Sequence, residues 1–145
     1  MAGLIVDDVM TRHPRTMSSA ATILAAYEAM SSGNFRHLPV LDGKRSIGIV
    51  SDRDILRHMP PLSHEPRDRA AHGQFLQRPI AEIMTQNPLT VLEGSPLEVV
   101  VELMLVNQVS AVLVEDQAAT LRGIVTTVDV ASALLRLLRG EISQR

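Results

Sequence analysis

The chain contains no cysteine and few aromatic residues, with one tyrosine, two phenylalanines and no tryptophan among 145 residues. Without thiols it can form neither disulfides nor thiolate metal sites, and a cysteine nucleophile is excluded. The three rings, those of Tyr27, Phe35 and Phe75, are too few to build the stacking platform on which proteins hold the bases of single-stranded nucleic acid. The absence of cysteine also fits a reducing compartment.

An excess of charge and long apolar runs are missing too. The 14 basic and 16 acidic residues give a net charge of −2, so no basic surplus attracts nucleic acid or an anionic membrane. Apolar stretches such as 99–101 are far shorter than the ~20 residues that cross a bilayer. The N-terminal segment reaches Asp7 and Asp8 too soon for a signal peptide. We therefore expect a soluble, cytoplasmic protein with neither nucleic acid nor membrane as a partner.

The usual catalytic and metal-binding patterns are also absent. The five histidines include no i, i+4 pair and no H-E-x-x-H motif, so we expect no metal site. Ser51 lacks the G-x-S-x-G context of a nucleophile elbow. Asp52 and Asp54 are two residues apart at a predicted helix start, which directs them to different faces and argues against paired acid–base chemistry. We expect no catalytic residue and no enzyme activity.

What the chain does contain is an internal duplication. Gly-Ile-Val-Ser-Asp-Arg-Asp-Ile at 48–55 recurs as Gly-Ile-Val-Thr-Thr-Val-Asp-Val at 123–130. Residues 9–16 likewise recur at 83–90, with Met, Thr, Pro and Thr at the same spacing.

The offset between the copies is constant from Met10 and Met84 through Val40 and Val114. The offset is larger by one residue at Gly48 and Gly123, the glycines of the repeated Gly-Ile-Val segment. Copy two therefore has one extra residue, which we place in a turn near 116–121. We predict repeat 1 over 1–60, a linker over 61–78, repeat 2 over 79–140 and a tail over 141–145.

The local patterns predict the same order of elements in both copies. In copy one they predict a helix over 22–31, strands over 38–41 and 46–50 joined by a turn at Asp42 and Gly43, and a helix over 51–59. In copy two they predict a helical turn over 80–84, an extended segment over 90–92, a helix with Ser95 as N-cap and Pro96 as first residue, strands over 111–114 and 121–125, and a helix from 126. Helices and strands that are segregated in this way indicate an α+β fold.

Two segments are harder to place. The linker is rich in proline and polar residues, so its first half is expected to be a loop, with a helical turn or two over 67–75. The last helix carries Val130, Leu134, Leu137 and Leu138 and should be buried by packing of one copy on the other and of one chain on another. Each copy alone has a small core and is only marginally stable by itself.

The start of the second helix in each copy carries a second kind of signal. Ser51 with Asp54, and Thr126 with Asp129, match the S/T-x-x-D form of a helix N-terminus. These can be plain capping boxes. They can also be half of a ligand site, in which spare backbone N–H groups bind an anion and the carboxylate accepts both hydroxyls of a ribose. The residues alone leave both interpretations open.

Together these motifs resemble a tandem pair of CBS (cystathionine-β-synthase) domains, a Bateman module, from about Val6 to Leu138. The resemblance rests on Met-Thr-x-x-Pro-x-Thr opening each copy, on Arg-His-Leu-Pro-Val-Leu-Asp at 36–42, and on Gly-Ile-Val-[Ser/Thr]-x-x-Asp closing both. It implies two β-α-β-β-α repeats packed through their sheets with pseudo-two-fold symmetry, two clefts between the copies, and a homodimer formed through the helices. It also implies a non-catalytic module that requires no cofactor, binds AMP, ADP, ATP, S-adenosylmethionine or NAD, and regulates a partner protein.

The resemblance assigns residues to both clefts. The first, expected to be the stronger, is lined by Asp54, Ser51, Ile49, Arg36, His37, Arg53, Pro88, Leu89 and Thr90. The second, expected to be weaker, is lined by Asp129, Thr126, Ile124, Ser110, Pro14, Arg15 and Thr16. The reason for this ranking is charge, because Arg36, His37 and Arg53 match Ser110, Ala111 and Val128. A phosphate in the second cleft would lose charge-assisted hydrogen bonds worth about 1.5–3 kcal/mol each.

Two functions from different classes remain. One is an adenine-nucleotide sensor whose ligand shifts the pose of copies or chains and thereby acts on a partner. The other is a structural or oligomerisation module whose ligand sites are vestigial.

Overall fold

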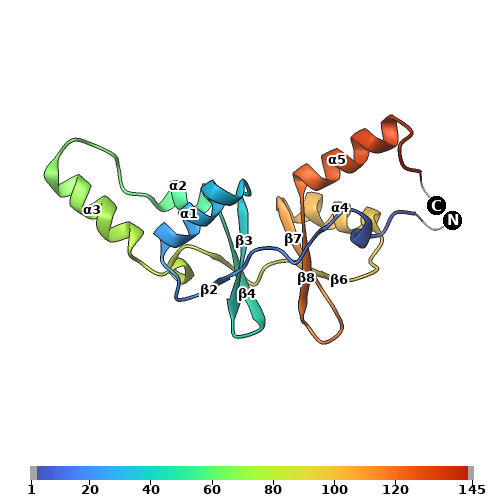
Figure 1. The fold of residues 1–145 in the computed structure, drawn as a ribbon, viewed down its shortest axis with the longest axis horizontal. Coiled ribbons are helices and arrows are strands. Elements are labelled where there is room, and N and C mark those ends of the chain that lie inside the picture. Colours follow the sequence, from blue (N-terminus) through green and yellow to red (C-terminus); the bar gives the residue numbers. More distant parts are fainter. Residues whose placement is uncertain (1–2, 144–145) are drawn as a thin grey trace. The chain divides into compact units, whose positions relative to one another are not determined.

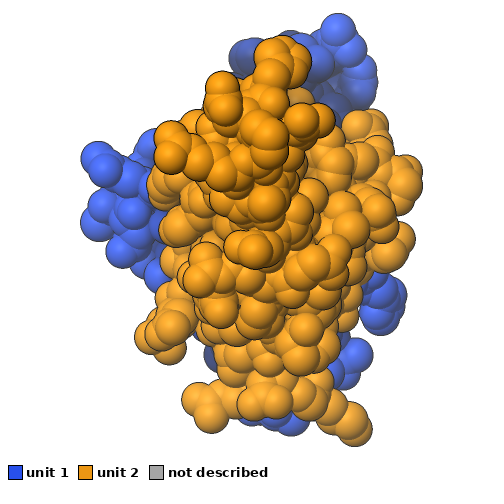
Figure 2. Space-filling view, turned by 90° about the vertical axis from the view of Figure 1, so that its left-hand side faces the viewer, with its two compact units in different colours: residues 1–14, 89–145 blue, residues 15–88 orange. Residues whose placement is uncertain are grey.

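The computed structural model describes residues 3–143, which fold into short strands and helices of the predicted α+β class (Figure 1). These residues form two compact units, coloured separately in Figure 2. Unit 2 is the continuous stretch 15–88. Unit 1 combines the described residues before Arg15 with those after Pro88.

Unit 2 is built on a four-stranded sheet with its strands in the order β2 (Met17–Ser18), β3 (His37–Asp42), β4 (Arg45–Ser51) and β5 (Thr85–Gln86). The β2–β3 pair is parallel, and the other neighbours are antiparallel. The remaining elements are α1 (Ile23–Gly33), α2 (Asp52–His58), α3 (Pro66–Leu76) and the 3-10 helix η2 (Ile80–Glu82).

Unit 1 repeats this plan. Its strands lie in the order β1 (Thr11–Arg12), β8 (Leu121–Thr126), β7 (Ala111–Glu115) and β6 (Thr90–Leu92), with β6 and β7 parallel and the other pairs antiparallel. Its helices are α4 (Leu97–Asn107), α5 (Thr127–Leu138) and the 3-10 helix η1 (Val6–Asp8). No described residue of unit 1 forms a counterpart of α3, which follows α2 in unit 2.

Each unit has its own apolar core, which is formed by side chains of its helices and of its sheet. In unit 2, Ile23 of α1, Leu38 of β3 and Val50 of β4 are fully buried, and Phe75 brings α3 into the same cluster. In unit 1 the cluster is Val6, Met10, Leu97, Val100, Met104, Val112, Val114 and Val125. Burial of such side chains contributes about 1.5–3 kcal/mol each.

The opening segment of each sequence copy lies in the unit that holds the body of the other copy. Val6 of η1 donates its N–H to the Ser95 carbonyl in unit 1 (2.8 Å), and Ile80 of η2 donates to the Ala21 carbonyl in unit 2 (2.8 Å). The compact units therefore divide the chain at other points than the sequence repeat does. The repeat boundaries 1–60, 61–78 and 79–140 remain a prediction. Residues 1 and 2 of the first repeat, and residues 144 and 145 of the tail, lie outside the described residues.

Most predicted elements are present within a few residues of their expected ends. Residues 42–45 separate the paired Leu41 and Ser46, whereas residues 116–120 separate Glu115 and Leu121, so the extra turn residue of copy two is confirmed. The helical turn expected in the linker is a full helix, α3, which begins with a proline. Among residues 3–143, no helix is long and apolar enough to cross a lipid bilayer.

The predicted start of α4 is wrong. Pro96, not Ser95, is the N-cap, and no side chain caps the helix. Ser95 instead turns back, its hydroxyl donating to the Leu92 carbonyl at 2.6 Å. The first N–H of the helix, on Leu97, donates to the Leu4 carbonyl at 2.8 Å, so the N-terminal segment of the chain takes the place of a side-chain cap.

Candidate functional site

The end of β4 and the start of α2 form the first candidate site, in unit 2. Ser51 is extended (φ −117°, ψ 165°), and its Oγ accepts the N–H of Asp54 at 3.2 Å. In return Oδ2 of Asp54 accepts the N–H of Ser51 at 2.8 Å and its hydroxyl at 3.0 Å. This reciprocal pattern is a capping box, so the predicted cap is confirmed.

The cap leaves half of the Asp54 carboxylate unused. The residue is only 9% exposed, and Oδ1 accepts no hydrogen bond from the described residues of unit 2. A carboxylate oxygen that the fold leaves without a partner is a strong acceptor for a ligand hydroxyl. The site therefore offers one oriented acceptor beside a rigid helix start.

The spare N–H donors expected at this helix start are not available. Asp52 donates to the Arg36 carbonyl (3.1 Å), Arg53 to the carboxylate of Asp52 (2.9 Å), and Asp54 to Ser51. No sequence pattern predicted that the side chain of Asp52 and the segment before β3 would accept hydrogen bonds from these N–H groups. The carboxylate, not the helix N-terminus, is what the site can present.

Arg36 and His37 reach the same edge of unit 2 because β3 begins beside the end of β4. His37 is paired with Ser51 in the sheet, and the Arg36 carbonyl holds the first N–H of α2. Arg36 also lines a hollow of about 370 Å³ between α1 and α2, whose other lining residues are Tyr27, Met30, Ser31, Asn34, Phe35, Asp52, Ile55 and Leu56. The structure thus places Arg36 and His37 beside the end of β4, and Arg53 in the first turn of α2.

The opening segment of copy two supplies the other side of this edge. Thr85 pairs with Ile49, and Gln86 with Gly48. Asn87, in a left-handed conformation (φ 51°), then turns the chain and donates to the Ile47 carbonyl at 3.4 Å. Pro88 follows in the same unit, whereas the predicted contacts Leu89 and Thr90 begin the second segment of unit 1.

Unit 1 carries the second candidate site with nearly the same geometry. Oδ2 of Asp129 accepts the N–H and the hydroxyl of Thr126 at 2.8 and 3.1 Å, which confirms the second capping box. Asp129 is half-buried, so this carboxylate is more open to water than that of Asp54. The Ser110 carbonyl accepts the first N–H of α5 at 3.0 Å, as the Arg36 carbonyl does for α2.

The remaining predicted residues of the second site are divided between the units. Ile124 is buried and pairs with Thr11 of the opening segment of copy one. Pro14 follows this segment within unit 1, whereas Arg15 and Thr16 belong to unit 2. There the guanidinium of Arg15 lies 5.9 Å from the centre of the Phe35 ring, within range of a cation–π contact.

The strand pairing of the two opening segments was not predicted from the sequence. Thr11 and Thr85 are each paired with the isoleucine of a Gly-Ile-Val strand. A signal was present, because both threonines recur at the constant offset of the repeat. It was interpreted only as a mark of the repeat and not as a contact.

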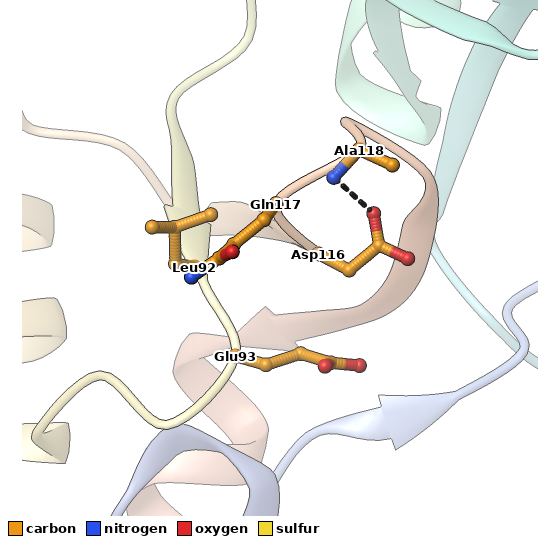
Figure 3. A pocket seen from close by; sticks show the side chains of 5 residues that line it. All are labelled: Leu92, Glu93, Asp116, Gln117 and Ala118. Carbon is orange, nitrogen blue, oxygen red and sulfur yellow. Dashed lines mark hydrogen bonds between the residues drawn. The ribbon is translucent and has the colours of Figure 1, made fainter.

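A hollow of about 410 Å³ lies at the other end of the β7–β8 hairpin from Asp129 (Figure 3). Leu92, Glu93, Asp116, Gln117 and Ala118 line it. The Asp116 carboxylate already accepts the N–H groups of Ala118 and Thr120 and pairs with Arg122 at 2.8 Å. These bonds lower the pKa of Asp116, the one to Thr120 most strongly. The carboxylate therefore stabilises the β7–β8 turn, and we assign no ligand to this hollow.

Comparison with known proteins gives a family for both copies. The family model for the CBS domain matches residues 6–61 and again residues 80–136. A CBS domain-containing protein of Dictyostelium discoideum is 28% identical over 138 residues, which cover 93% of this chain and 94% of that protein. Five further relatives are longer, and this chain spans 22–45% of their lengths; four of them have the names of enzymes.

Two similar solved structures contain ligands. The CBS domain pair of protein MJ0100, in complex with 5′-methylthioadenosine and S-adenosyl-L-methionine, is 28% identical with a TM-score of 0.75, and the match covers 97% of this chain and 99% of that one. CBSX2 of Arabidopsis thaliana, in complex with AMP, is 25% identical with a TM-score of 0.75, over 93% and 98% of the two chains.

Proposed function

Because the chain belongs to the CBS domain family and carries that domain twice, we propose that it is a regulatory module that binds an adenosine-containing ligand. The ligand class comprises AMP, ADP, ATP, S-adenosylmethionine and NAD. Binding changes the behaviour of a partner protein, and the module itself catalyses no reaction. In the longer relatives the matching region is one part of a larger chain, which supports a role as an attached or separate regulator.

The observation that carries the proposal is the half-used carboxylate of Asp54. Its Oδ2 is fixed by the cap, so the orientation of Oδ1 is set before any ligand arrives. A pre-oriented acceptor binds a hydroxyl without the entropic cost of ordering a side chain. The ribose diol of an adenosine ligand offers two such hydroxyls, and the same arrangement is present at Asp129. The adenosine-containing ligands of MJ0100 and CBSX2 support the ligand class.

The two sites are proposed to differ in their affinity for phosphate. Arg36 and His37 lie at the start of β3 beside Ser51, and Arg53 is exposed in the first turn of α2. A phosphate group bound there can form charge-assisted hydrogen bonds. The matching residues of unit 1 are Ser110, Ala111 and Val128, which carry no charge. We therefore assign phosphorylated ligands to the Asp54 site and uncharged adenosine groups, or none, to the Asp129 site.

A second candidate function is an oligomerisation module with vestigial sites. The observation that favours it is the exposed apolar surface of α4 and α5, which a ligand-binding role does not require. In that case both aspartates are only caps, and their carboxylates contribute to helix stability alone.

A thermal-unfolding panel separates the two functions. AMP, ADP, ATP, S-adenosylmethionine, NAD and cyclic di-AMP are added to the full chain, with GMP as the control for the base. A ligand at a hundred times its Kd adds about 2.7 kcal/mol to the free energy of unfolding, which raises Tm by roughly 5 °C or more. We expect at least one adenine ligand to give this shift and GMP to give less. If no adenine ligand moves Tm, the oligomerisation function replaces ligand sensing.

A further inference from the structure

The hollow between α1 and α2 has a mixed aromatic and aliphatic lining. Its volume of about 370 Å³ is in the range of small-molecule sites. Tyr27 and Phe35, which line it, are two of the three aromatic residues of the chain. Met30 and Ile55 also line it and are only 5% and 1% exposed. All of these residues belong to unit 2, so the hollow lies within one unit.

The ring of Phe35 is held in this lining by its neighbours. A Cβ added to Gly33 would overlap Cε1 of Phe35, so the ring packs directly on the glycine backbone at the end of α1. Asn34, between the two, is in the left-handed conformation (φ 54°) and ends the helix. The guanidinium of Arg15 lies 5.9 Å from the centre of the ring. One wall of the hollow is therefore fixed before any ligand arrives, which lowers the entropic cost of binding.

Two opposite charges border the hollow and do not pair with each other. Asp52 donates its N–H to the Arg36 carbonyl at 3.1 Å, so the two lining residues are close neighbours. Oδ1 of Asp52 accepts the N–H of Arg53 at 2.9 Å. Within the described part of unit 2, however, no ion pair joins Asp52 to Arg36, and no hydrogen bond involves the Arg36 guanidinium. Both charged groups are therefore available to a ligand.

Copy two has neither a ring nor a charge at the matching positions. The correspondence follows the offset of the repeat, with the extra turn residue of copy two counted in. The residues that match Tyr27, Phe35, Arg36 and Asp52 are Val101, Val109, Ser110 and Thr127. Both copies fold into the same order of helices and strands around the hollow, so this fold needs neither the rings nor the charges. Their presence in copy one points to a ligand.

We propose that the hollow between α1 and α2 binds a free α-amino acid with an apolar side chain. Such a molecule carries a carboxylate and an ammonium group on the same carbon atom. The carboxylate suits the guanidinium of Arg36, and the ammonium group suits the neighbouring carboxylate of Asp52. The side chain of the amino acid then lies against Tyr27, Phe35 and Met30. A ligand with only one charge would leave one of the two protein groups without a partner.

This amino-acid site goes beyond the proposed function and does not depend on it. It requires neither the carboxylate of Asp54 nor any residue of unit 1. Arg36 is shared by both proposals, because it is also assigned to the phosphate group of an adenosine ligand. The experiment therefore changes Asp52 and not Arg36, and its samples contain no adenine ligand.

Calorimetric titration of the full chain with L-leucine, L-methionine and L-phenylalanine tests the site. We expect at least one of them to bind with a Kd below about 1 mM. The tightest of the three is then compared with its analogue without the amino group, which for phenylalanine is 3-phenylpropanoate. The analogue should bind wild type at least about tenfold more weakly, because it loses a charge-assisted hydrogen bond. In Asp52→Asn, which removes the charge but keeps an oxygen, this difference should shrink to about threefold or less.

The matched control is Asp42→Asn, which changes an exposed carboxylate at the other end of β3, outside the hollow. It should keep the full difference between amino acid and analogue. The variant Tyr27→Val/Phe35→Val gives copy one the residues of copy two, so it should fold, and it should bind the amino acid at least about tenfold more weakly. The proposal is overturned if wild type binds none of the three amino acids below about 1 mM. A difference that survives Asp52→Asn, or unchanged binding by the double valine variant, overturns it too.

Discussion

Each Gly-Ile-Val segment has its glycine inside a strand, Gly48 in β4 and Gly123 in β8, next to a methionine from the opening segment of the other copy. A Cβ added to Gly48 would lie 2.5 Å from Sδ of Met84 and 3.0 Å from the Thr85 carbonyl oxygen. At Gly123 the same atoms, from Met10 and Thr11, would be 2.6 and 2.9 Å away. The glycines are needed so that β5 and β1 can approach their neighbouring strands.

We expect Gly48→Ala and Gly123→Ala each to lower the free energy of unfolding by about 1–3 kcal/mol, because the backbone oxygen cannot move aside as a side chain can. Urea unfolding measures the change. Gly73→Ala is the control, since a Cβ there meets nothing within 4 Å and the site is inside α3. It should raise stability by about 0.5–1 kcal/mol. Equal effects at all three positions would contradict this account of the glycines.

The sequence predicted the residues of the caps better than their surroundings. The spacing of Ser51 and Asp54 fixes a reciprocal pair of bonds, because the two partners lie on one turn of the helix. The position of Met10 over Gly123 and of Met84 over Gly48 could not be predicted, because each pair joins segments that are far apart in the sequence. The N–H of Asp52 was expected to be free for a similar reason. Its acceptor, the Arg36 carbonyl, lies on the other side of the β3–β4 hairpin in the sequence.

Among the elements, the β7–β8 turn is held by one carboxylate. Asp116 accepts the N–H groups of Ala118 and Thr120 and pairs with Arg122. These partners lower its pKa below the ordinary value of 3.8. A group with a lowered pKa in the folded state stabilises the fold above its unfolded pKa, and this contribution is lost as pH falls through the folded pKa.

Replacing Asp116 by Asn removes the charge but keeps an oxygen that can accept from the turn. We expect the variant to be less stable than wild type near neutral pH, with the difference shrinking as pH falls below 3.8. Chemical unfolding at several pH values measures this. Asp42→Asn in the β3–β4 turn is the control, because the Asp42 carboxylate accepts no hydrogen bond from the described residues of unit 2. A difference that stays constant with pH would contradict the assigned role of Asp116.

Element types followed from local patterns, whereas several element ends did not. The helix periodicity of copy one and the turn at Gly43 are local signals, and both predicted the structure well. The start of α4 was misplaced because Ser95 and Pro96 look like a cap and a first residue, yet the bonds that fix this end of the helix come from Leu4 and Val6. The amphipathic pattern of α5 predicted a helix but could not show which of its two apolar faces its own unit would cover.

At the scale of the whole molecule, the chain is a duplication whose copies exchange their opening segments. Strand β1 of copy one joins the sheet of unit 1, and β5 of copy two joins the sheet of unit 2. The repeat was evident from the sequence, since a constant offset between matching residues needs no structural knowledge to find. The exchange was not, because so short a strand has no periodicity that could reveal its partner.

The two copies have also diverged in their side chains. Copy one has Arg36, His37 and Arg53 where copy two has the uncharged Ser110, Ala111 and Val128, and copy two exposes aliphatic side chains on α4 and α5. We propose that the carboxylate of Asp54 holds the diol of a ribose.

Calorimetric titration of AMP and of 2′-deoxy-AMP tests this claim most directly. For wild type we expect the deoxy ligand to bind at least about tenfold more weakly, since a hydrogen bond to a charged group contributes about 1.5–3 kcal/mol. The ratio between the two ligands should fall to about one in Asp54→Ala and persist in Asp129→Ala and in the matched control Asp52→Ala. Equal binding of both ligands to wild type, or a ratio that survives Asp54→Ala, would contradict the account.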